Sequence, residues 1–363
     1  MRSRGVDARG VTIMGACCSS STPSATPAEV RTAAERAAAA IRALPPPPPS
    51  RSADVAQLRP HVEVLLPLLR LLASTGAQAM VGGVSEAEPE PVKVTSCLDA
   101  AASVPGLLDA LIARVTPGTH LGIVHVTLDA LGVLGVSPRT GALMRSRADL
   151  LDSCADALRS EVLEVRVSAA ILLANIRGKD ADAPSMLRAL TPRLWGALKD
   201  SLRDDVNGMV RMCVAMAVFG LSRAPDAVAL FCSDLDLLKL LLHLGAGTYN
   251  IGARAGLSPA EVSSMADQIR VRAFLSLAML ADNPDGKYAV FGVPGLVNEV
   301  KVYAKRGNSP GSRRAAEVLL SMFDTLFQAS PLPASVHLAA MFPARNPDGG
   351  LAVHAVRVMD GEM

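Results

Sequence analysis

The chain has 363 residues and a formal net charge of +2, and 50% of its residues are hydrophobic although only 3% are aromatic. A net charge so close to zero gives no bulk electrostatic reason to bind nucleic acid, so we expect no nucleic-acid partner. The apolar runs are short and interrupted, and none approaches the roughly 18 residues of a membrane-spanning helix. A core with so few aromatic side chains must consist mainly of Ala, Leu, Val and Met, which lets helices stack closely.

The amino-terminal residues 1–26 are small, polar and rich in Ser, Thr and Pro, a composition that predicts disorder. Within them, the segment from Met14 reads Met-Gly-Ala-Cys-Cys-Ser and matches the N-myristoylation pattern. Gly15 would carry the myristoyl chain, and Cys17 and Cys18 would carry palmitoyl chains, because a single acyl chain binds membranes only marginally. An internal glycine cannot be myristoylated. Either translation begins at Met14, or the match is due to chance and the tail is unmodified.

A helix follows directly after this tail. Thr26, Pro27 and Glu29 form a capping-box sequence, which predicts a helix that continues to about Leu44. The five prolines 45–49 end this helix and predict a stiff polyproline spacer. We therefore assign residues 1–50 to an N-terminal segment that precedes the main domain.

A second helical region is predicted over residues 54–74, with Pro67 marking a kink or a helix start. Beyond it, an apolar phrase of twelve residues recurs, and in its four strong copies the second residue is Arg. The copies begin 42, 45, 59 and 43 residues apart, and they are Ile123–Leu134, Val165–Ile176, Val210–Leu221, Ile269–Leu280 and Ser312–Phe323. Helical repeats with periods in the forties indicate a right-handed α-solenoid, an all-α fold. We assign residues 51–330 to this solenoid and residues 331–363 to a loosely ordered tail.

Two segments carry a resemblance to a known family. The stretch 165–178 reads VRVSAAILLANIRG, and the stretch 293–307 reads VPGLVNEVKVYAKRG and precedes the Ser312 phrase. They resemble the third and second helices of armadillo repeats, and the resemblance covers roughly Ser52 to Ala329. Whether the repeats are of the armadillo or the HEAT type stays open at this point. With the acylation motif, the chain resembles N-terminally acylated armadillo adaptors of the vacuole-anchored and armadillo-repeats-only types. That resemblance implies an adaptor that recruits cytosolic partners to a membrane.

Helical spacing divides each phrase into two stripes. Positions 1, 5, 8, 9 and 12 should face the core, whereas positions 4, 7 and 11 should line a groove. The groove stripe is small and apolar, which suits an amphipathic helix or an extended apolar segment of a protein partner. The alternative is that the stripe belongs to the core. The candidate groove residues are Ser168, Ile171, Asn175, Met216, Arg272, Leu275 and Met279.

Importin-like grooves resemble this stack but present an Asn at position 11 in unit after unit, with nearby Trp residues. Here only Asn175 occupies that position, and the sole tryptophan, Trp195, precedes a phrase. We therefore do not expect capture of basic localisation peptides. The arginines at the second phrase position offer another surface. They could form a basic ladder for an acidic peptide, or they could cap neighbouring helix ends, and they are Arg166, Arg211, Arg270 and Arg313.

The sequence offers no pattern for catalysis or metal binding. The six histidines lack metal-ligand spacing, and no nucleotide-binding, zinc or nucleophile-elbow motif occurs. We expect no enzyme activity, cofactor, metal or small-molecule substrate. Single cysteines in apolar phrases indicate buried thiols and a reducing, cytoplasmic location. Two hypotheses remain: a lipid-anchored adaptor, peripheral on the cytosolic face of a membrane, or a soluble scaffold within a cytoskeletal or ciliary assembly.

Overall fold

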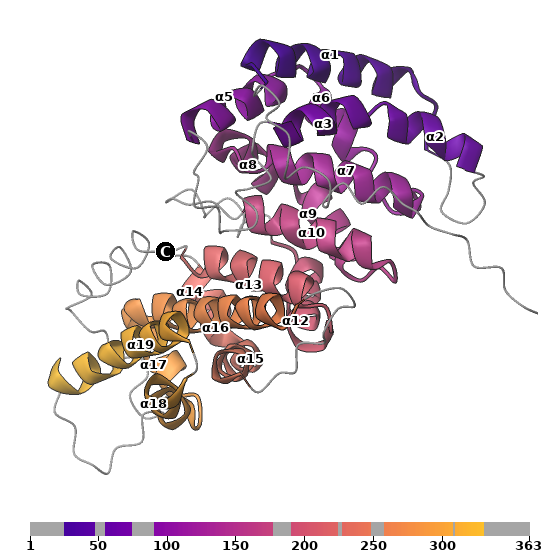
Figure 1. Cartoon of the computed structure of the whole chain (residues 1–363). Coiled ribbons are helices and arrows are strands. Elements are labelled where there is room, and N and C mark those ends of the chain that lie inside the picture. The colour runs from indigo at the N-terminus through magenta and orange to yellow at the C-terminus, as the bar shows by residue number, and fades with distance from the viewer. Residues whose placement is uncertain are drawn as a thin grey trace, which may run out of the picture.

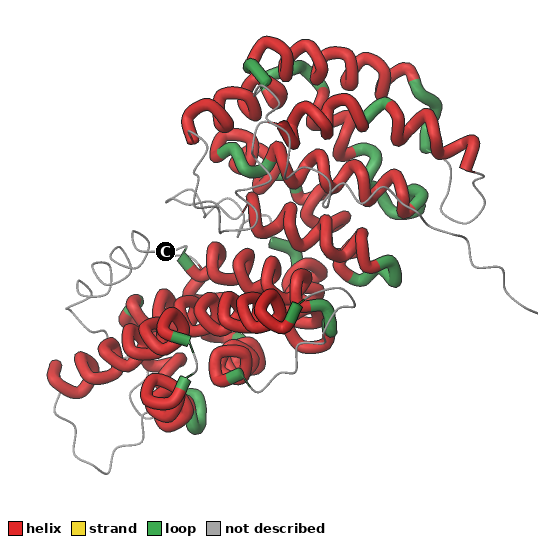
Figure 2. The backbone as a smooth tube through the Cα atoms, viewed as in Figure 1, coloured by secondary structure: helices red, strands yellow, loops and turns green. Residues whose placement is uncertain are grey.

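The computed structural model describes residues 25–47, 55–74, 91–176, 190–223, 227–247, 258–307 and 309–329. In these residues the regular secondary structure is helical, and Figure 2 shows helices joined by loops without a strand. The acylation residues Gly15, Cys17 and Cys18 and the tail 331–363 lie outside the described residues. Within the described part, no helix combines the length and the hydropathy needed to cross a membrane.

The first helix, α1 (Pro27–Ala43), begins as predicted. The Thr26 Oγ1 accepts from the Glu29 N–H at 3.3 Å, and the Glu29 carboxylate accepts from the Thr26 N–H at 2.7 Å. Two further helices follow, α2 (Val55–Glu63) and α3 (Leu66–Ser74). The break between them lies at residues 64–65, and Pro67, which cannot donate a backbone hydrogen bond, is the second residue of α3. Pro67 therefore accompanies a helix start, one of the two outcomes the sequence predicted.

The boundary predicted at residue 50 does not match the packed body. Val30, Ala34 and Ala38 of α1 are fully buried, and α1 packs against α5 (Pro91–Ala102). The Arg114 Nη2 donates to the carbonyl of Ile41 at 2.9 Å and ties the end of α1 to the repeats. The solenoid thus includes a helix assigned to the N-terminal segment, because the small Ala side chains allow close packing.

The phrases are the last helices of five stacked units, which we name A to E. Unit A comprises α5, α6 (Leu107–Ile112) and α7 (Leu121–Leu134), and unit B comprises α8 (Pro138–Arg145), α9 (Ala148–Leu158) and α10 (Leu163–Ile176). Unit C contains α12 (Pro192–Asp204) and α13 (Gly208–Ser222). Unit D comprises α14 (Ala227–Ser233), α15 (Leu235–Ala246) and α16 (Pro259–Asp282), and unit E comprises α17 (Pro284–Phe291), α18 (Leu296–Arg306) and α19 (Pro310–Ala329). Units A, B, D and E have three helices each, the first short in B, D and E, and this favours the armadillo type over the two-helix HEAT type.

The third helices form a continuous stack. Helix α10 packs on α7, α13 on α10, α16 on α13 and α19 on α16, and Figure 1 shows the chain progressing along this stack from α1 to α19. The predicted core stripe is confirmed most clearly in α10, where all five positions are fully buried: Val165, Ala169, Leu172, Leu173 and Ile176. Each unit therefore buries its apolar face against its neighbours, as a solenoid requires.

Hydroxyl groups connect successive units. Ser137 and Thr191 are the N-caps of α8 and α12, and each accepts a hydrogen bond from the backbone of its own helix. Each hydroxyl also donates to an aspartate of the preceding unit, from Ser137 to Asp99 and from Thr191 to Asp152 at 2.6 Å. The same hydroxyl thus starts a helix and fixes its register against the preceding unit.

Candidate protein-binding surfaces

The third helices α10 and α13 are buried over most of their circumference. Ser168, Ile171 and Leu275 were predicted to line an open groove, but their exposed fractions are 2%, 7% and 1%. Gly132 on α7 has no side chain, and the Ile171 side chain lies 3.6 Å from the position that a Gly132 Cβ would occupy. The groove prediction is therefore wrong for these three residues, because neighbouring third helices approach too closely to leave the stripe exposed.

Asn175 is half-buried, and its side chain also contacts α7 of the preceding unit. Its Nδ2 donates to the Gly132 carbonyl of α7 at 2.8 Å. Ser168 bonds across the same boundary, because its Oγ donates to Asp129 at 2.5 Å. Both polar groups of the predicted α10 groove thus bind the preceding unit.

The remaining groove candidates lie on α13 and α16 and are half-buried: Met216, Arg272 and Met279. The Arg272 guanidinium lies 5.6 Å from the centre of the Phe219 ring, close enough for a cation–π contact. We call these three residues the α13–α16 patch. Its role in partner binding stays a prediction, since burial shows only which side chains are accessible.

A Ser–Asp–His cluster in units A and B was not predicted. One carboxylate oxygen of Asp129 accepts the hydrogen bond from Ser168. The His125 Nε2 lies 3.3 Å from the other oxygen. Burial raises the pKa of Asp129, and His125 and Ser168 oppose the rise. The serine proton points to the carboxylate and not to an imidazole, so the cluster lacks the serine–base pair of nucleophilic catalysis. In the described residues, no three potential ligands gather into a metal site.

The arginine series does not form a free basic ladder. Arg166 pairs with Asp205 at 2.8 Å and donates to the Ser160 and Glu161 carbonyls beyond the end of α9. Arg211 is buried, and its Nη2 donates to the Arg203 carbonyl in the last turn of α12 at 3.1 Å. Both side chains cap the helix that precedes their own, which was the alternative reading of the series. The acidic-peptide prediction is therefore wrong for Arg166 and Arg211.

The other two arginines lie against glycines. Gly247 is the C-cap of α15 with φ of 75°, and the Arg270 Nε lies only 2.8 Å from where a Gly247 Cβ would be. Arg313 lies similarly close to Gly307, the C-cap of α18. These four arginines thus share one structural position, next to the end of the preceding helix.

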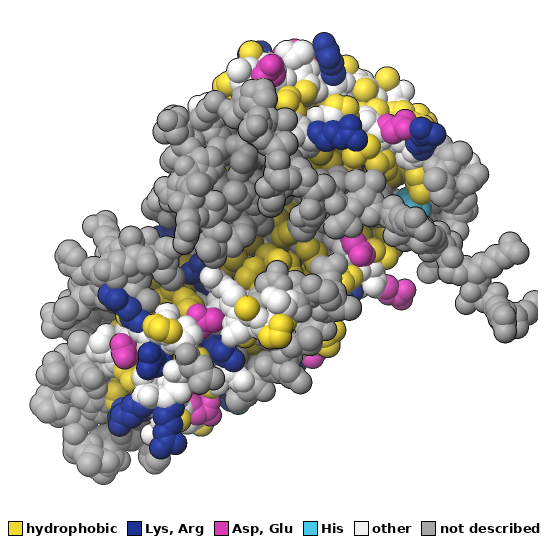
Figure 3. Space-filling model, viewed as in Figure 1, with side chains coloured by type: hydrophobic (Ala, Val, Ile, Leu, Met, Phe, Trp, Pro, Cys, Tyr) yellow, Lys and Arg dark blue, Asp and Glu magenta, His cyan; other side chains and the backbone are white. Residues whose placement is uncertain are grey.

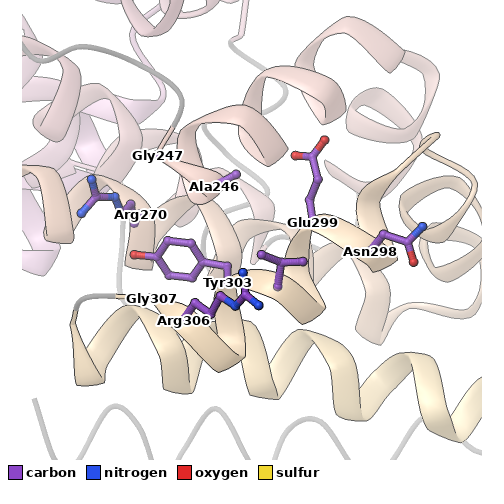
Figure 4. A pocket seen from close by; sticks show the side chains of 9 residues that line it. Ala246, Gly247, Arg270, Asn298, Glu299, Tyr303, Arg306 and Gly307 are labelled. Carbon is purple, nitrogen blue, oxygen red and sulfur yellow. The ribbon is translucent and has the colours of Figure 1, made fainter.

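A pocket of about 510 Å³ opens beside Arg270, between the ends of α15 and α18 (Figure 4). The side chains of Arg306, Tyr303 and Glu299 and the exposed Val302 line it. In Figure 4 the Tyr303 hydroxyl points toward the side of Arg270, whereas Glu299 lies at the opposite side. Sequence reasoning singled out only Arg270 among these residues, because the others belong to α18 and not to a phrase.

Comparisons with known proteins support the architecture alone. A computationally designed armadillo repeat protein for modular peptide recognition matches with a TM-score of 0.49 and 15% identity, over 74% of this chain and 99% of that chain. An engineered protein matches with a TM-score of 0.51 and 18% identity, over 73% of this chain and 96% of that chain. No protein-family model and no curated protein matches the sequence. The match to the engineered protein supports the fold alone, and the three-helix units A, B, D and E make this fold an armadillo-like α-solenoid.

Proposed function

We propose that this chain is a non-enzymatic adaptor that binds a protein partner through the solenoid and is tethered by acylation to the cytosolic face of a membrane. The α13–α16 patch carries the first part of the proposal. Met216 and Met279 are partly accessible apolar side chains on neighbouring third helices, whereas the other groove candidates Ser168, Ile171 and Leu275 are buried. Flexible, polarizable methionines suit the apolar face of an amphipathic partner helix.

The combined variant Met216→Glu and Met279→Glu tests the patch. It places two charges where an apolar partner surface would dock, and unpaired burial of such charges costs several kcal/mol by order of magnitude. Proteins bound by the wild-type chain should be lost, while the melting temperature stays close to that of the wild type. A matched control carries Leu143→Glu and Leu235→Glu, two side chains that are 50% and 46% exposed elsewhere on the solenoid. Equal loss in both variants would exclude the patch as the binding surface.

The membrane part of the proposal depends on the Met-Gly-Ala-Cys-Cys-Ser motif. A chain translated from Met14 should sit on membranes, and Gly15→Ala should release it, because the myristoyl acceptor is lost. Replacing Cys17 and Cys18 by Ser should leave weak, transient binding through the remaining acyl chain. Ala16→Ser, at a position that the pattern leaves unspecified, serves as the control. If the Gly15→Ala chain stays on membranes, acylation is not the anchor.

A further inference from the structure

Two helix ends occupy equivalent places in the solenoid but carry opposite charge. Helix α12 of unit C ends at Asp204 and has Asp205 as its C-cap, whereas α18 of unit E ends at Arg306 and has Gly307 as its C-cap. Both C-caps come five residues before the phrase of their unit. Each end faces the second-position arginine of the preceding unit.

At the boundary between units B and C, which we call the B–C junction, the solenoid supplies its own carboxylate. The Asp205 side chain is 6% exposed, and its Oδ2 accepts from the Arg166 Nε at 2.8 Å. Arg166 also donates to two carbonyls beyond the end of α9, so the guanidinium bonds to both units.

The boundary between units D and E, the D–E junction, lacks this carboxylate. Gly307 occupies the position that Asp205 has in unit C. Tyr303 and the aliphatic part of the Arg313 side chain lie where a Gly307 Cβ would be. Among the described residues, neither Arg270 nor Arg306 has a carboxylate within ion-pairing distance. The pocket of about 510 Å³ opens at this position.

The surroundings of the pocket favour an anion over a cation. Lys305 and Arg306 end α18 and are exposed, and Figure 3 shows Lys and Arg side chains gathered over the part of the molecule where α18 lies in Figure 1. The carbonyl ends of α15 and α18 oppose an anion. At the B–C junction, Arg166 also contacts the carbonyls beyond the end of α9, and a carboxylate binds there nonetheless.

Among the described residues, Glu299 is the one acidic side chain that lines the pocket. Its Oε2 is buried without a hydrogen-bond partner in the structure, and the side chain lies across the pocket from Arg270 in Figure 4. A peptide carboxylate is therefore favoured near Arg270 and Arg306, on the side away from Glu299. The exposed Val302 lines the same pocket and offers an apolar contact.

We infer that the D–E junction pocket binds an acidic segment of a protein partner, whose carboxylate takes the place that Asp205 has at the B–C junction. This deepens the proposed adaptor function and depends on it, but it uses a different surface from the α13–α16 patch. Arg270 and Arg306 bind the carboxylate, and the negative charge of Glu299 keeps it at their side of the pocket. The pocket selects acidic peptides against their neutral counterparts.

Fluorescence anisotropy with the full chain tests this inference, using a fluorescein-labelled glutamate-rich peptide and its glutamine counterpart as probes. The glutamate peptide should bind the wild type more tightly. The combined variant Arg270→Gln and Arg306→Gln should weaken this binding about tenfold or more, because it removes two charge-assisted contacts. Glu299→Gln should strengthen binding, because it removes the negative charge that lies across the pocket from Arg270.

A matched control with Arg36→Gln and Arg139→Gln makes the same charge change at exposed positions on α1 and α8. Equal weakening in the control, equal binding of both peptides, or unchanged binding in the pocket variant would overturn the inference. So would weaker binding after Glu299→Gln. Circular dichroism and the melting temperature verify that each variant is folded. Loss of partners from the α13–α16 patch variant is measured separately, so a failed pocket leaves the adaptor proposal standing.

Discussion

The B–C and D–E junctions stack the same kinds of helix yet differ in their polar contacts. Across the B–C junction, Arg166 pairs with Asp205, Arg159 with Asp200 and Arg193 with Asp156. At the D–E junction, Ser309 donates to Asp267 at 2.6 Å, but Arg270 and Arg306 face a pocket. The apolar stack holds both junctions together. The polar groups at its edge are thus free to differ, and a binding site can form where the chain omits its own carboxylate.

The largest expected effect comes from a charge inside the stack that both junctions share. Leu275 on α16 is 1% exposed, so Leu275→Glu would bury an unpaired carboxylate at a cost of several kcal/mol by order of magnitude. We expect loss of helical signal or a sharply lower melting temperature by circular dichroism. Met216→Glu, at a half-buried position, is the comparison variant and should stay folded. If the Leu275→Glu protein is as stable as the wild type, Leu275 lines an accessible groove and is not part of the core.

The two arginines that define the comparison should differ in their contribution to stability. Arg166→Ala leaves the nearly buried Asp205 without its partner and should lower the free energy of unfolding by about 2–4 kcal/mol. Arg270→Ala removes no ion pair and should cost about 1 kcal/mol or less. Urea unfolding of both variants measures the difference. A double-mutant cycle with Asp205→Asn isolates the pair, and equal costs at both positions would remove the distinction between the junctions.

A smaller effect is expected at the N-cap of α12. The Thr191 hydroxyl accepts from the Leu194 N–H at 3.2 Å and donates to Asp152. Thr191→Ala removes both bonds and should cost about 1–2 kcal/mol. Thr191→Ser keeps the hydroxyl and should recover most of the loss in the same unfolding measurement. If serine fails to recover it, the hydroxyl is not what links units B and C.

The smallest effect concerns pH at the amino-terminal end. The His61 Nδ1 lies 2.5 Å from the Arg114 Nη1, and burial, with the Arg114 charge, lowers the pKa of His61 below its ordinary 6.5. The unfolded chain therefore binds more protons than the folded chain as the pH falls below 6.5, so stability is lost in that range. Melting temperatures should fall between about pH 7.5 and about pH 5. His61→Gln should flatten this dependence, and an unchanged slope would mean that other groups cause it.

The sequence predicted the stack well because burial follows helical spacing. Val165, Leu172 and Ile176 are inside as expected, and Thr26 and Glu29 form the predicted cap. The groove prediction failed at Leu275 and Ile171, since no single-helix pattern reports how closely the next helix approaches. For the same reason α1 was assigned outside the solenoid, because its main partner α5 lies far along the chain, beyond α2 and α3.

The pocket was missed because it depends on residues of two units. Arg270 alone resembles Arg166, and the difference appears only when the C-caps of α12 and α18 are compared. Counting five residues back from each phrase gives Asp205 in unit C and Gly307 in unit E. This comparison needs only the sequence and the repeat register, so the signal was present before the structure.

Hydrogen–deuterium exchange of the full chain, with and without the glutamate-rich peptide, tests the contrast between the junctions most directly. The peptide should slow exchange in the last turn of α18 and at the end of α15, around Arg306 and Gly247. Exchange at the end of α12, around Asp205, should not change, because Arg166 already holds a carboxylate there. Protection at both junctions, or at the B–C junction alone, would contradict the account.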